Sequence, residues 1–263
     1  MHDGKKVIGW DFRCYNTFMN KPLVIVTGSS YGLGFAVVQM LLINHFSVIG
    51  ISRTIPTIDD KEFQWIKTDV TDEDEVKNLK TVIKAKHIDI LINNAGTAIE
   101  QKSLEFTDDE FNKTFDLNFK APINVTAALY SKLDNSLVMN ISSLSDRFAG
   151  DLFGLYCASK AALNIYFDTV ALEYKNIKVI NILPDYIDTP LQHKTNDNKT
   201  FDWKLTMKPQ QVADAVRYII QNQQTLESGT RVIIIPEILK SDASDPEKLW
   251  VYNVDTKEMH KLK

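Results

Sequence analysis

The sequence predicts an α/β fold in which a doubly wound, parallel sheet of seven strands lies between two layers of helices. Three observations lead to this prediction. Short apolar runs alternate with stretches of helical length, which is typical of β-α-β units. Most of the short runs are almost wholly apolar, as strands buried on both faces are. The 263 residues suit a single domain, and no long linker rich in Gly, Ser or Pro divides them.

The expected elements follow one another along the chain. The strands are expected at residues 23–27, 47–51, 63–67, 88–92, 137–141, 177–182 and 231–235. The helices between them are expected at residues 33–44, 73–84, 109–133, 155–174 and 209–222. Pro209 opens the last helix, where a residue without an N–H is well tolerated.

Two segments lie outside the domain, which is expected to span residues 21–239. Residues 1–20 form an N-terminal extension and residues 240–263 a C-terminal one. Residues 249–254 and 258–262 fit the two strands of a hairpin, with disorder of either end as the alternative. The core pattern is complete by about Pro236, so the tail is not expected to be needed for the core. Its apolar cluster is nevertheless too large to stay bare, so we expect it to dock on the body or on a neighbouring subunit, beside the N-terminal residues Ile8, Trp10 and Phe12.

Composition narrows the class of protein. A formal charge of −4 provides no field that would attract nucleic acid or anionic lipid. No apolar run reaches the roughly 18 residues of a membrane span, and residues 1–20 lack the apolar region of a signal peptide. Two cysteines, Cys14 and Cys157, form neither a disulfide framework nor a metal-ligand pattern. We therefore expect a cytoplasmic protein without a metal site and without a nucleic-acid or membrane partner.

A glycine-rich loop follows the first expected strand and runs directly into a helix. It reads Thr27-Gly28-Ser29-Ser30-Tyr31-Gly32-Leu33-Gly34. Its glycines permit a sharp turn, a close approach of backbone N–H groups to a pyrophosphate, and close packing of the helix on the sheet. The loop therefore predicts a Rossmann-like dinucleotide site, against the alternative of a purely structural turn.

The end of the second expected strand bears on the choice of cofactor. An acidic residue at this point favours NAD, because its carboxylate binds the adenosine ribose hydroxyls. Here the residues are Ser52 and Arg53, and a guanidinium pairs well with a 2′-phosphate. We therefore expect NADP(H) rather than NAD(H), against the alternative that Arg53 is an ordinary surface residue.

Tyr156 and Lys160 lie four residues apart on an expected helix and so share one of its faces. A cation beside a phenol favours the phenolate, so Tyr156 is expected to exchange a proton below its usual pKa of about 10. Ser143 offers a second hydrogen bond to the same substrate oxygen. Carbonyl reduction needs such a proton donor beside the oxygen while a nicotinamide delivers hydride to the carbon. By itself, a Tyr and a Lys at this spacing usually belong to a solvated face.

Taken together, the motifs resemble those of the short-chain dehydrogenase/reductase family. The resemblance covers about residues 22–236 and rests on the glycine-rich loop, Asp69-Val70, Asn93-Asn94-Ala95-Gly96, Asn118, Ser143, Tyr156-x-x-x-Lys160 and Pro184…Thr189. It implies an NADP(H)-dependent oxidoreductase that interconverts a carbonyl and an alcohol by hydride transfer.

The resemblance also implies a role for each site residue. Tyr156 would be the general acid, Ser143, thirteen residues earlier, would hold the substrate oxygen, and Lys160 would bind the nicotinamide ribose. Asn118 would hold a water that relays protons to Lys160. The implied cofactor contacts are Gly28, Ser30, Tyr31, Gly32 and Leu33 in the loop, Arg53, Asp69 and Val70 near the adenosine, Asn93, Ala95 and Gly96 beside the ribose, and Tyr156, Lys160, Pro184, Ile187 and Thr189 near the nicotinamide.

Two positions depart from the family pattern. Asp185 stands where glycine is usual, so its Cβ restricts the backbone there, and its carboxylate is a candidate substrate-facing acid. Tyr31 stands where a basic residue is frequent, which leaves Arg53 alone in support of NADP.

The resemblance places a substrate lid at about residues 190–208. Its apolar residues Phe201, Trp203, Leu205 and Met207, with Phe148, Leu152 and Phe153 before Tyr156, fit an apolar ketone, aldehyde or diketone, or are ordinary loop packing. The scattered lysines of the lid argue against a thioester carried on an acyl carrier protein. By resemblance, the helices carrying Asn118 and Tyr156 would pair subunits into a dimer or tetramer. The alternatives are a non-catalytic NADP-binding redox sensor and an epimerase or dehydratase of the same fold.

Overall fold

The computed structural model describes residues 21–195, 202–236 and 249–261. Its strands form one sheet in the order β3-β2-β1-β4-β5-β6-β7-β8-β9, parallel except for β9. The strands are β1 (Leu23–Thr27), β2 (Ser47–Ser52), β3 (Phe63–Lys67), β4 (Ile90–Asn93), β5 (Ser136–Ile141), β6 (Ile177–Pro184), β7 (Thr230–Ile235), β8 (Leu249–Asn253) and β9 (Glu258–Lys261). The predicted α/β class and all seven predicted strands are confirmed, but the sheet gains two strands from the C-terminal tail.

Apolar strands form because both faces of the sheet are covered. Along β1, Val24 and Val26 belong to one buried cluster and Ile25 to the other. Successive side chains of a strand point to opposite faces, so a strand between two helical layers needs an apolar residue at every position. This explains why the central strands β1, β4 and β5 are buried at almost every position, whereas β3 at the edge exposes Gln64 and Lys67.

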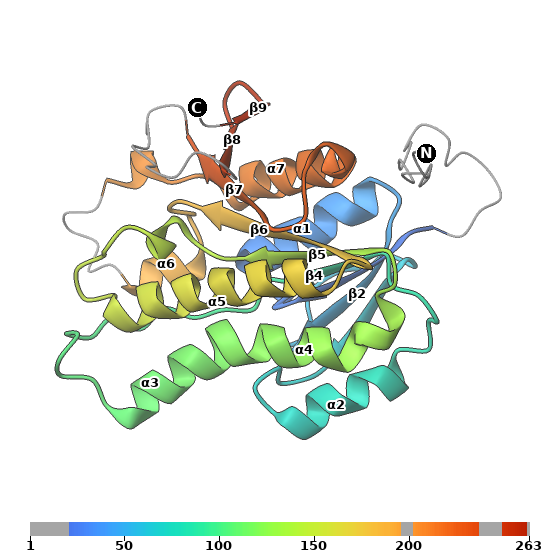
Figure 1. The fold of residues 1–263 in the computed structure, drawn as a ribbon, viewed down its shortest axis with the longest axis horizontal. Coiled ribbons are helices and arrows are strands. Elements are labelled where there is room, and N and C mark those ends of the chain that lie inside the picture. Colours follow the sequence, from blue (N-terminus) through green and yellow to red (C-terminus); the bar gives the residue numbers. More distant parts are fainter. Residues whose placement is uncertain (1–20, 196–201, 237–248, 262–263) are drawn as a thin grey trace.

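Helices cover both faces of the sheet, and Figure 1 shows them as two layers. One layer holds α1 (Gly32–Ile43) and α7 (Pro209–Gln221), and the other holds α2 (Glu73–Val82), α4 (Ala121–Leu129) and α5 (Gly154–Glu173). The helix expected over residues 109–133 is divided into α3 (Asp108–Phe115), a π-helical turn (Asp116–Lys120), α4 and a short 3₁₀ turn. A short helix, α6 (Pro190–Thr195), lies in the expected lid.

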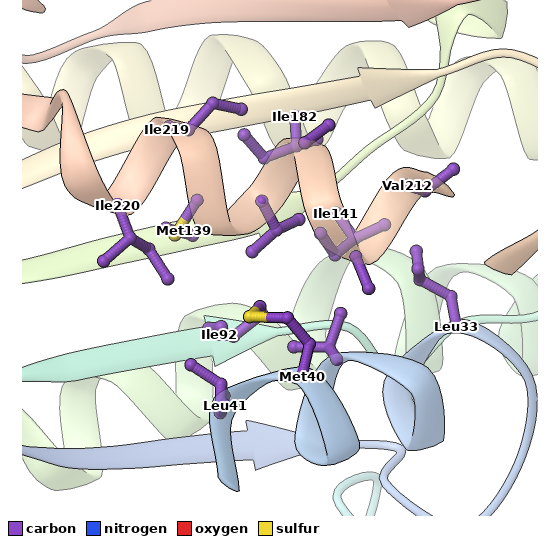
Figure 2. Packing of buried hydrophobic residues seen from close by; sticks show 14 of the residues in the cluster. Leu33, Met40, Leu41, Ile92, Met139, Ile141, Ile182, Val212, Ile219 and Ile220 are labelled. Atoms are coloured by element: carbon purple, nitrogen blue, oxygen red, sulfur yellow. The ribbon is translucent and has the colours of Figure 1, made fainter. Parts of the chain in front are cut away.

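The larger core lies between the sheet and the layer of α1 and α7. Figure 2 shows Met40 and Leu41 of α1 directed toward Ile92 of the sheet, and Ile219 of α7 and Met139 of β5 belong to the same buried cluster. All five side chains are buried. Burying a large aliphatic side chain contributes about 1.5–3 kcal/mol, so this contact fixes the two helices and, with α1, the loop that precedes it.

The C-terminal tail forms the predicted hairpin and joins the sheet. β8 pairs in parallel with β7, and β9 pairs antiparallel with β8. Tyr252 and Val254 are buried in the core of α1 and α7, and Val251 is buried on the opposite face. The expectation that the core ends near Pro236 is therefore wrong, because β8 supplies buried residues to both faces. The N-terminal extension with Ile8, Trp10 and Phe12, and residues 237–248, lie outside the described residues.

Neither a membrane-spanning helix nor a cluster of metal ligands occurs in residues 21–195, 202–236 and 249–261. None of the helices there combines the length and apolar character that crossing a bilayer requires. In those same segments, no three His, Cys, Asp or Glu side chains are grouped as metal ligands.

Candidate active site

A cavity of about 680 Å³ opens at the carboxyl ends of the parallel strands. It is lined by the segments that follow β1, β2, β4, β5 and β6, together with α6. β1 pairs with β2 on one side and with β4 on the other, so the order of the strands reverses at β1. Ligands of open α/β sheets bind in the crevice at such a reversal.

The glycine-rich loop forms the floor of this cavity. Gly28 and Gly32 have φ values of 68° and 60°, in the left-handed region that strongly favours glycine. A Cβ on Gly34 would lie 2.2 Å from the carbonyl oxygen of Gly28 and 2.4 Å from Nδ2 of Asn94. The first two glycines therefore make the turn, and the third allows the helix to lie against the strand ends.

The N-terminus of α1 faces the cavity, with Tyr31, Gly32 and Leu33 in its lining. Among the described residues, no side chain caps this helix at Tyr31, and its first turn contains no acidic residue. The first N–H groups of a helix have no partner within the helix and attract anions. The loop is therefore suited to hold a phosphate.

The segment after β2 is neutral at the strand end and positively charged one residue later. Ser52 is buried, accepts a hydrogen bond from Nε1 of Trp65 at 3.1 Å and donates one to the Thr54 carbonyl at 2.7 Å. The side chain of Arg53 is 70% exposed, and its Nη1 lies 3.7 Å from Oδ2 of Asp69. Both Arg53 and Asp69 line the cavity.

The environment of Asp69 favours its ionised form, which can bind a hydrogen-bond donor or a cation. Burial raises its pKa, but hydrogen bonds from Thr71 and the charge of Arg53 outweigh this effect, so the pKa of Asp69 is lowered. Val70 follows it in the cavity wall. Asp69 therefore stays ionised beside Arg53 at neutral pH.

The two asparagines at the end of β4, Asn93 and Asn94, face different ways. Asn93, expected beside the cavity, is buried and donates to Oδ1 of Asn140 at 2.9 Å and to Oγ1 of Thr126 at 3.1 Å. Asn94 lines the cavity with Ala95 and Gly96. Because Asn93 is still part of the strand, its side chain alternates to the α4 face, and the cavity position belongs to the residue after it. The side chain that lines the cavity is thus that of Asn94, and a cofactor contact at Asn93 stays a prediction.

Ser143, Tyr156 and Lys160 meet in the wall of the same cavity. Ser143 follows β5 and caps a 3₁₀ turn (Leu144–Asp146), its Oγ accepting from the Ser145 N–H at 3.1 Å. Lys160 is 4% exposed and donates from Nζ to the Ile141 carbonyl at 2.9 Å. Nζ also lies 5.8 Å from the centre of the Tyr156 ring.

The pKa values of this group differ from expectation. Burial raises the pKa of Tyr156, and the hydrogen bond with Ser143 offsets this only in part. Burial also lowers the pKa of Lys160 to about 8. The expected lowering of the Tyr156 pKa by Lys160 is absent, because the cost of burying each charged form exceeds their interaction and the ammonium is directed to the Ile141 carbonyl.

Asn118 lies behind the cavity rather than in its wall. It is fully buried within the π-helical turn and donates from Nδ2 to the Thr97 carbonyl at 2.8 Å and to Oγ of Ser159 at 3.0 Å. A Cβ on Gly96 would lie 3.3 Å from Oδ1 of Asn118 and 3.5 Å from Nζ of Lys160. Asn118 and Lys160 thus approach Gly96 together, and the water relay stays a prediction.

The segment after β6 brings Pro184, Asp185, Tyr186, Ile187 and Thr189 to the cavity. The backbone of Asp185 is outside the left-handed region, so a residue with a Cβ is unstrained where the family pattern has glycine. Oδ1 of Asp185 accepts from the Tyr186 N–H at 2.9 Å, and burial raises the pKa of this carboxyl group. Tyr186 was not foreseen, because no spacing in the sequence sets it apart.

The apolar wall of the cavity differs from the expected lid. Phe148 and Phe153 line the cavity, as do Leu144 and Leu191, whereas Leu152 does not. Met207 is buried in the core instead, because its backbone bonds to Tyr186 and Asp188 direct its side chain beneath the sheet end. Trp203 stacks on His193, with ring centres 4.1 Å apart, and with Leu205 lies outside the wall. Phe201 lies outside the described residues.

Known proteins resemble this chain over most of its length. The family model for short chain dehydrogenases matches residues 22–200. An uncharacterized oxidoreductase of Staphylococcus haemolyticus is 26% identical over 218 residues, which cover 78% of this chain and 93% of the relative. A fatty acyl-CoA reductase of Acinetobacter baylyi is 27% identical over 216 residues, covering 75% and 72%. The ligand-free aldohexose dehydrogenase of Thermoplasma acidophilum superposes with a TM-score of 0.75 at 25% identity, covering 87% of this chain and 98% of that one.

Proposed function

The chain belongs to the short-chain dehydrogenase/reductase family, and on this premise we propose that it interconverts a carbonyl and an alcohol by hydride transfer with NADP(H). The observation that carries the proposal is the meeting of Ser143, Tyr156 and Lys160 in the cavity that the glycine-rich loop also lines. The same cavity thus holds a proton donor, a second hydrogen-bond donor and a phosphate-binding helix end.

The residues present fit a dinucleotide. Gly28, Gly32 and Gly34 line the cavity, so the backbone of this loop can be approached closely by a ligand. The uncapped N-terminus of α1 would hold the pyrophosphate. NADPH, when bound, supplies the hydride.

In the proposed reaction, Tyr156, Ser143 and Lys160 each act through a group that donates a proton or a hydrogen bond. Tyr156 remains protonated at neutral pH because burial raises its pKa, so it is ready to donate its proton to the substrate oxygen during reduction. Ser143 would donate a hydrogen bond to that oxygen. Lys160 would hold the nicotinamide ribose through its ammonium group, and the Ile141 carbonyl keeps it in place.

NADP(H) is preferred over NAD(H) in this proposal because of Ser52 and Arg53. Ser52 has its hydrogen bonds satisfied within the protein and offers no carboxylate to ribose hydroxyls. Arg53 is largely exposed and its contact with Asp69 is long, so its guanidinium is free to turn to a 2′-phosphate at little cost.

The side chains beside Ser143 and Tyr156 in the cavity wall bear on the substrate class. Phe148, Phe153, Leu144 and Leu191 make this wall apolar, which favours an apolar ketone, aldehyde or diketone. Asp185 is the exception, since its carboxylate accepts hydrogen bonds from hydroxyl groups. Two of the three similar proteins represent these two chemistries, one named a fatty acyl-CoA reductase and the other an aldohexose dehydrogenase.

We also propose a homodimer or homotetramer, whose subunits pair through the helix face that carries exposed apolar side chains. Phe111 of α3 and Ile165, Tyr166 and Leu172 of α5 are exposed, and α3 and α5 are in contact. Such a patch is typical of a protein interface. The cytoplasm, where NADPH is available, is the proposed location.

The test is a screen of NADPH oxidation with an aliphatic aldehyde, an aromatic diketone, a ketoacyl thioester and an aldohexose lactone, with NADH in parallel. Turnover of a carbonyl compound with NADPH supports the proposal. Tight NADPH binding with no turnover of any compound would instead favour the redox sensor. Conversion of an aldohexose added to the same screen, without net change in NADPH, would favour an epimerase or dehydratase.

A further inference from the structure

A buried carboxylate lies three residues beyond Ser143. The side chain of Asp146 is 2% exposed and ends the 3₁₀ turn that Ser143 caps. Its Oδ1 accepts from Nε of Arg147 at 2.7 Å, and its Oδ2 accepts from Nη2 of Arg147 at 2.9 Å, Nδ2 of Asn164 at 2.7 Å and Nη1 of Arg231 at 3.3 Å. A buried charge is stable only when paired and hydrogen-bonded in this way.

Arg231 connects this carboxylate to the helix that carries Tyr156. It belongs to β7, is 20% exposed, and also binds Oδ2 of Asp168 in α5 through Nε at 3.1 Å and through Nη2. Oδ1 of Asp168 in turn accepts from Nδ2 of Asn181 at 3.0 Å. One guanidinium therefore joins the turn after β5, the strand β7 and the helix α5.

The contacts on α5 follow a single face of the helix. Tyr156, Lys160, Asn164 and Asp168 are spaced by four residues, and side chains at this spacing are neighbours on a helix. This face carries Tyr156 and Lys160 of the candidate site at one end. At the other end it carries Asn164, which binds Asp146, and Asp168, which binds Arg231. This arrangement links the position of the turn to that of Tyr156.

Three buried asparagines and Arg231 form a row across neighbouring strands of the sheet. Asn93, Asn140, Asn181 and Arg231 lie at matching positions on β4, β5, β6 and β7. Asn93 donates to Asn140 at 2.9 Å, and Asn140 donates to Asn181 at 2.8 Å. The row fixes the register of the strand from which Ser143 emerges and ends on Arg231.

Ser143 therefore lies between two attachments to α5. Before it, the Ile141 carbonyl accepts from Lys160; after it, Asp146 is held by Asn164 and Arg231. We propose that Asp146 and Arg231 are positioning residues, whose ion pair holds the turn on α5 and so places the Ser143 hydroxyl beside Tyr156. This inference rests on the proposed function, since it assigns Ser143 a part in the reaction.

The first test compares two arginines that bind the same carboxylate. Arg231→Met removes the ionic bridge from Asp146 to Asp168 of α5 and leaves the Asn164 hydrogen bond in place, whereas Arg147→Met removes only the neighbouring partner of Asp146. We expect Arg231→Met to lower kcat about tenfold or more, since a misplacement of about 1 Å can cost ~100-fold. Arg147→Met should stay within about threefold of the parent, and Arg231→Lys, which keeps the charge but loses the two-pronged contact, should be intermediate. The assay uses NADPH and the fastest carbonyl compound of the screen, and NADPH affinity by fluorescence titration should change little in all three.

A double-mutant cycle separates positioning from a general loss of structure. In a Ser143→Ala background, Arg231→Met should change kcat by less than about twofold, because the hydroxyl that it positions is already gone. An equal loss in both backgrounds would overturn the inference and leave Arg231 with a purely structural role. If Arg231→Met does not fold, Asp168→Asn, which weakens the same link while keeping its volume, takes its place. A Ser143→Ala enzyme as fast as the parent would contradict the proposed function itself, whereas a slow Ser143→Ala enzyme with a fast Arg231→Met one contradicts only this inference.

Discussion

Lys160 is a charged residue in a buried position, and burial disfavours its charged form. It is almost wholly buried, and burial lowers its pKa to about 8. A buried ammonium is destabilising unless it is paired, and here its partner is the Ile141 carbonyl at 2.9 Å. A residue kept at such a cost beside Tyr156 is typical of a functional site, where perturbed pKa values gather.

The burial of Lys160 should make the free energy of unfolding depend on pH in a measurable way. In the unfolded chain its pKa is about 10.5, and in the folded protein it is about 8. Between these values the unfolded state binds the proton and the folded state does not, so stability rises with pH. Relative to Lys160→Met, the parent should gain up to about 3 kcal/mol of unfolding free energy between pH 7 and 10.5, at about 1.4 kcal/mol per pKa unit. Urea denaturation of both proteins across this range provides the measurement, and parallel curves would contradict the burial of a titrating lysine.

Tyr156 is the residue whose change should affect the chemistry most directly. Tyr156→Phe keeps the ring and removes the transferable proton, so kcat should fall by at least about 100-fold. NADPH binding, followed by fluorescence titration, should persist. Tyr166→Phe on the exposed face of the same helix is the matched control and should retain parental turnover. A Tyr156→Phe enzyme as fast as the parent would remove Tyr156 from the proposed mechanism.

Arg53 carries the proposed choice of cofactor. Arg53→Ala should weaken NADPH binding by about 1.5–3 kcal/mol, the usual contribution of a hydrogen bond to a charged group, and leave NADH binding nearly unchanged. Fluorescence titration with both cofactors measures the two affinities, and Arg217→Ala, at a partly exposed arginine of α7 outside the cavity, serves as control. A parent protein that binds NADH more tightly than NADPH would be incompatible with the NADP proposal.

At the scale of elements, the helix before β5 and the tail after β7 both differ from the expected pattern. The stretch expected as one helix contains a π-helical turn in which the Ala121 N–H bonds to the Asp116 carbonyl. Such turns are rare and occur often at functional sites, and this one holds Asn118 behind Gly96. The tail, by contrast, extends the sheet beyond β7, so its strands cover an edge that would otherwise be open.

The burial of β8 implies that the hairpin stabilises the domain. Tyr252 is 2% exposed and its ring lies 5.3 Å from that of Tyr218 in α7. Tyr252→Ala should lower the free energy of unfolding by about 3–5 kcal/mol, as large aromatic deletions in cores do. His260→Ala on the exposed side of β9 should change it by less than about 0.5 kcal/mol. Urea denaturation compares the two, and a Tyr252→Ala protein as stable as the parent would show that the tail is an appendage.

At the scale of the whole molecule, the candidate site is assembled from segments far apart in the chain. The glycine-rich loop, the ends of β2, β4, β5 and β6, and the helix α5 meet only because parallel strands end at one edge of the sheet. The row of three amides and Arg231 crosses β4, β5, β6 and β7 beneath this cavity. The sheet is thus the frame that keeps the hydroxyls of Ser143 and Tyr156 in one cavity.

Much of this architecture was predictable from local patterns. The seven central strands and the main helices lie within two residues of their expected places, because apolar runs and helix-length segments are properties of consecutive residues. The turn at Gly28 and Gly32 was predictable for the same reason, since glycine is the residue that adopts positive φ most readily. The gathering of Ser143, Tyr156 and Lys160 at one cavity also agrees with the spacing of these residues along the chain.

Other features were decided by the tertiary structure alone. Which of Asn93 and Asn94 faces the cavity depends on where β4 ends, and whether Met207 covers the cavity or fills the core depends on its backbone pairing with Tyr186 and Asp188. The direction of the Tyr156 pKa depends on desolvation, which is set by every atom around the hydroxyl and not by the lysine four residues later. The sequence by itself determines which residues form strands, helices and tight turns, because those preferences act between neighbours. Burial, facing and charge balance belong to the folded molecule, because they depend on residues that folding brings together from distant parts of the chain.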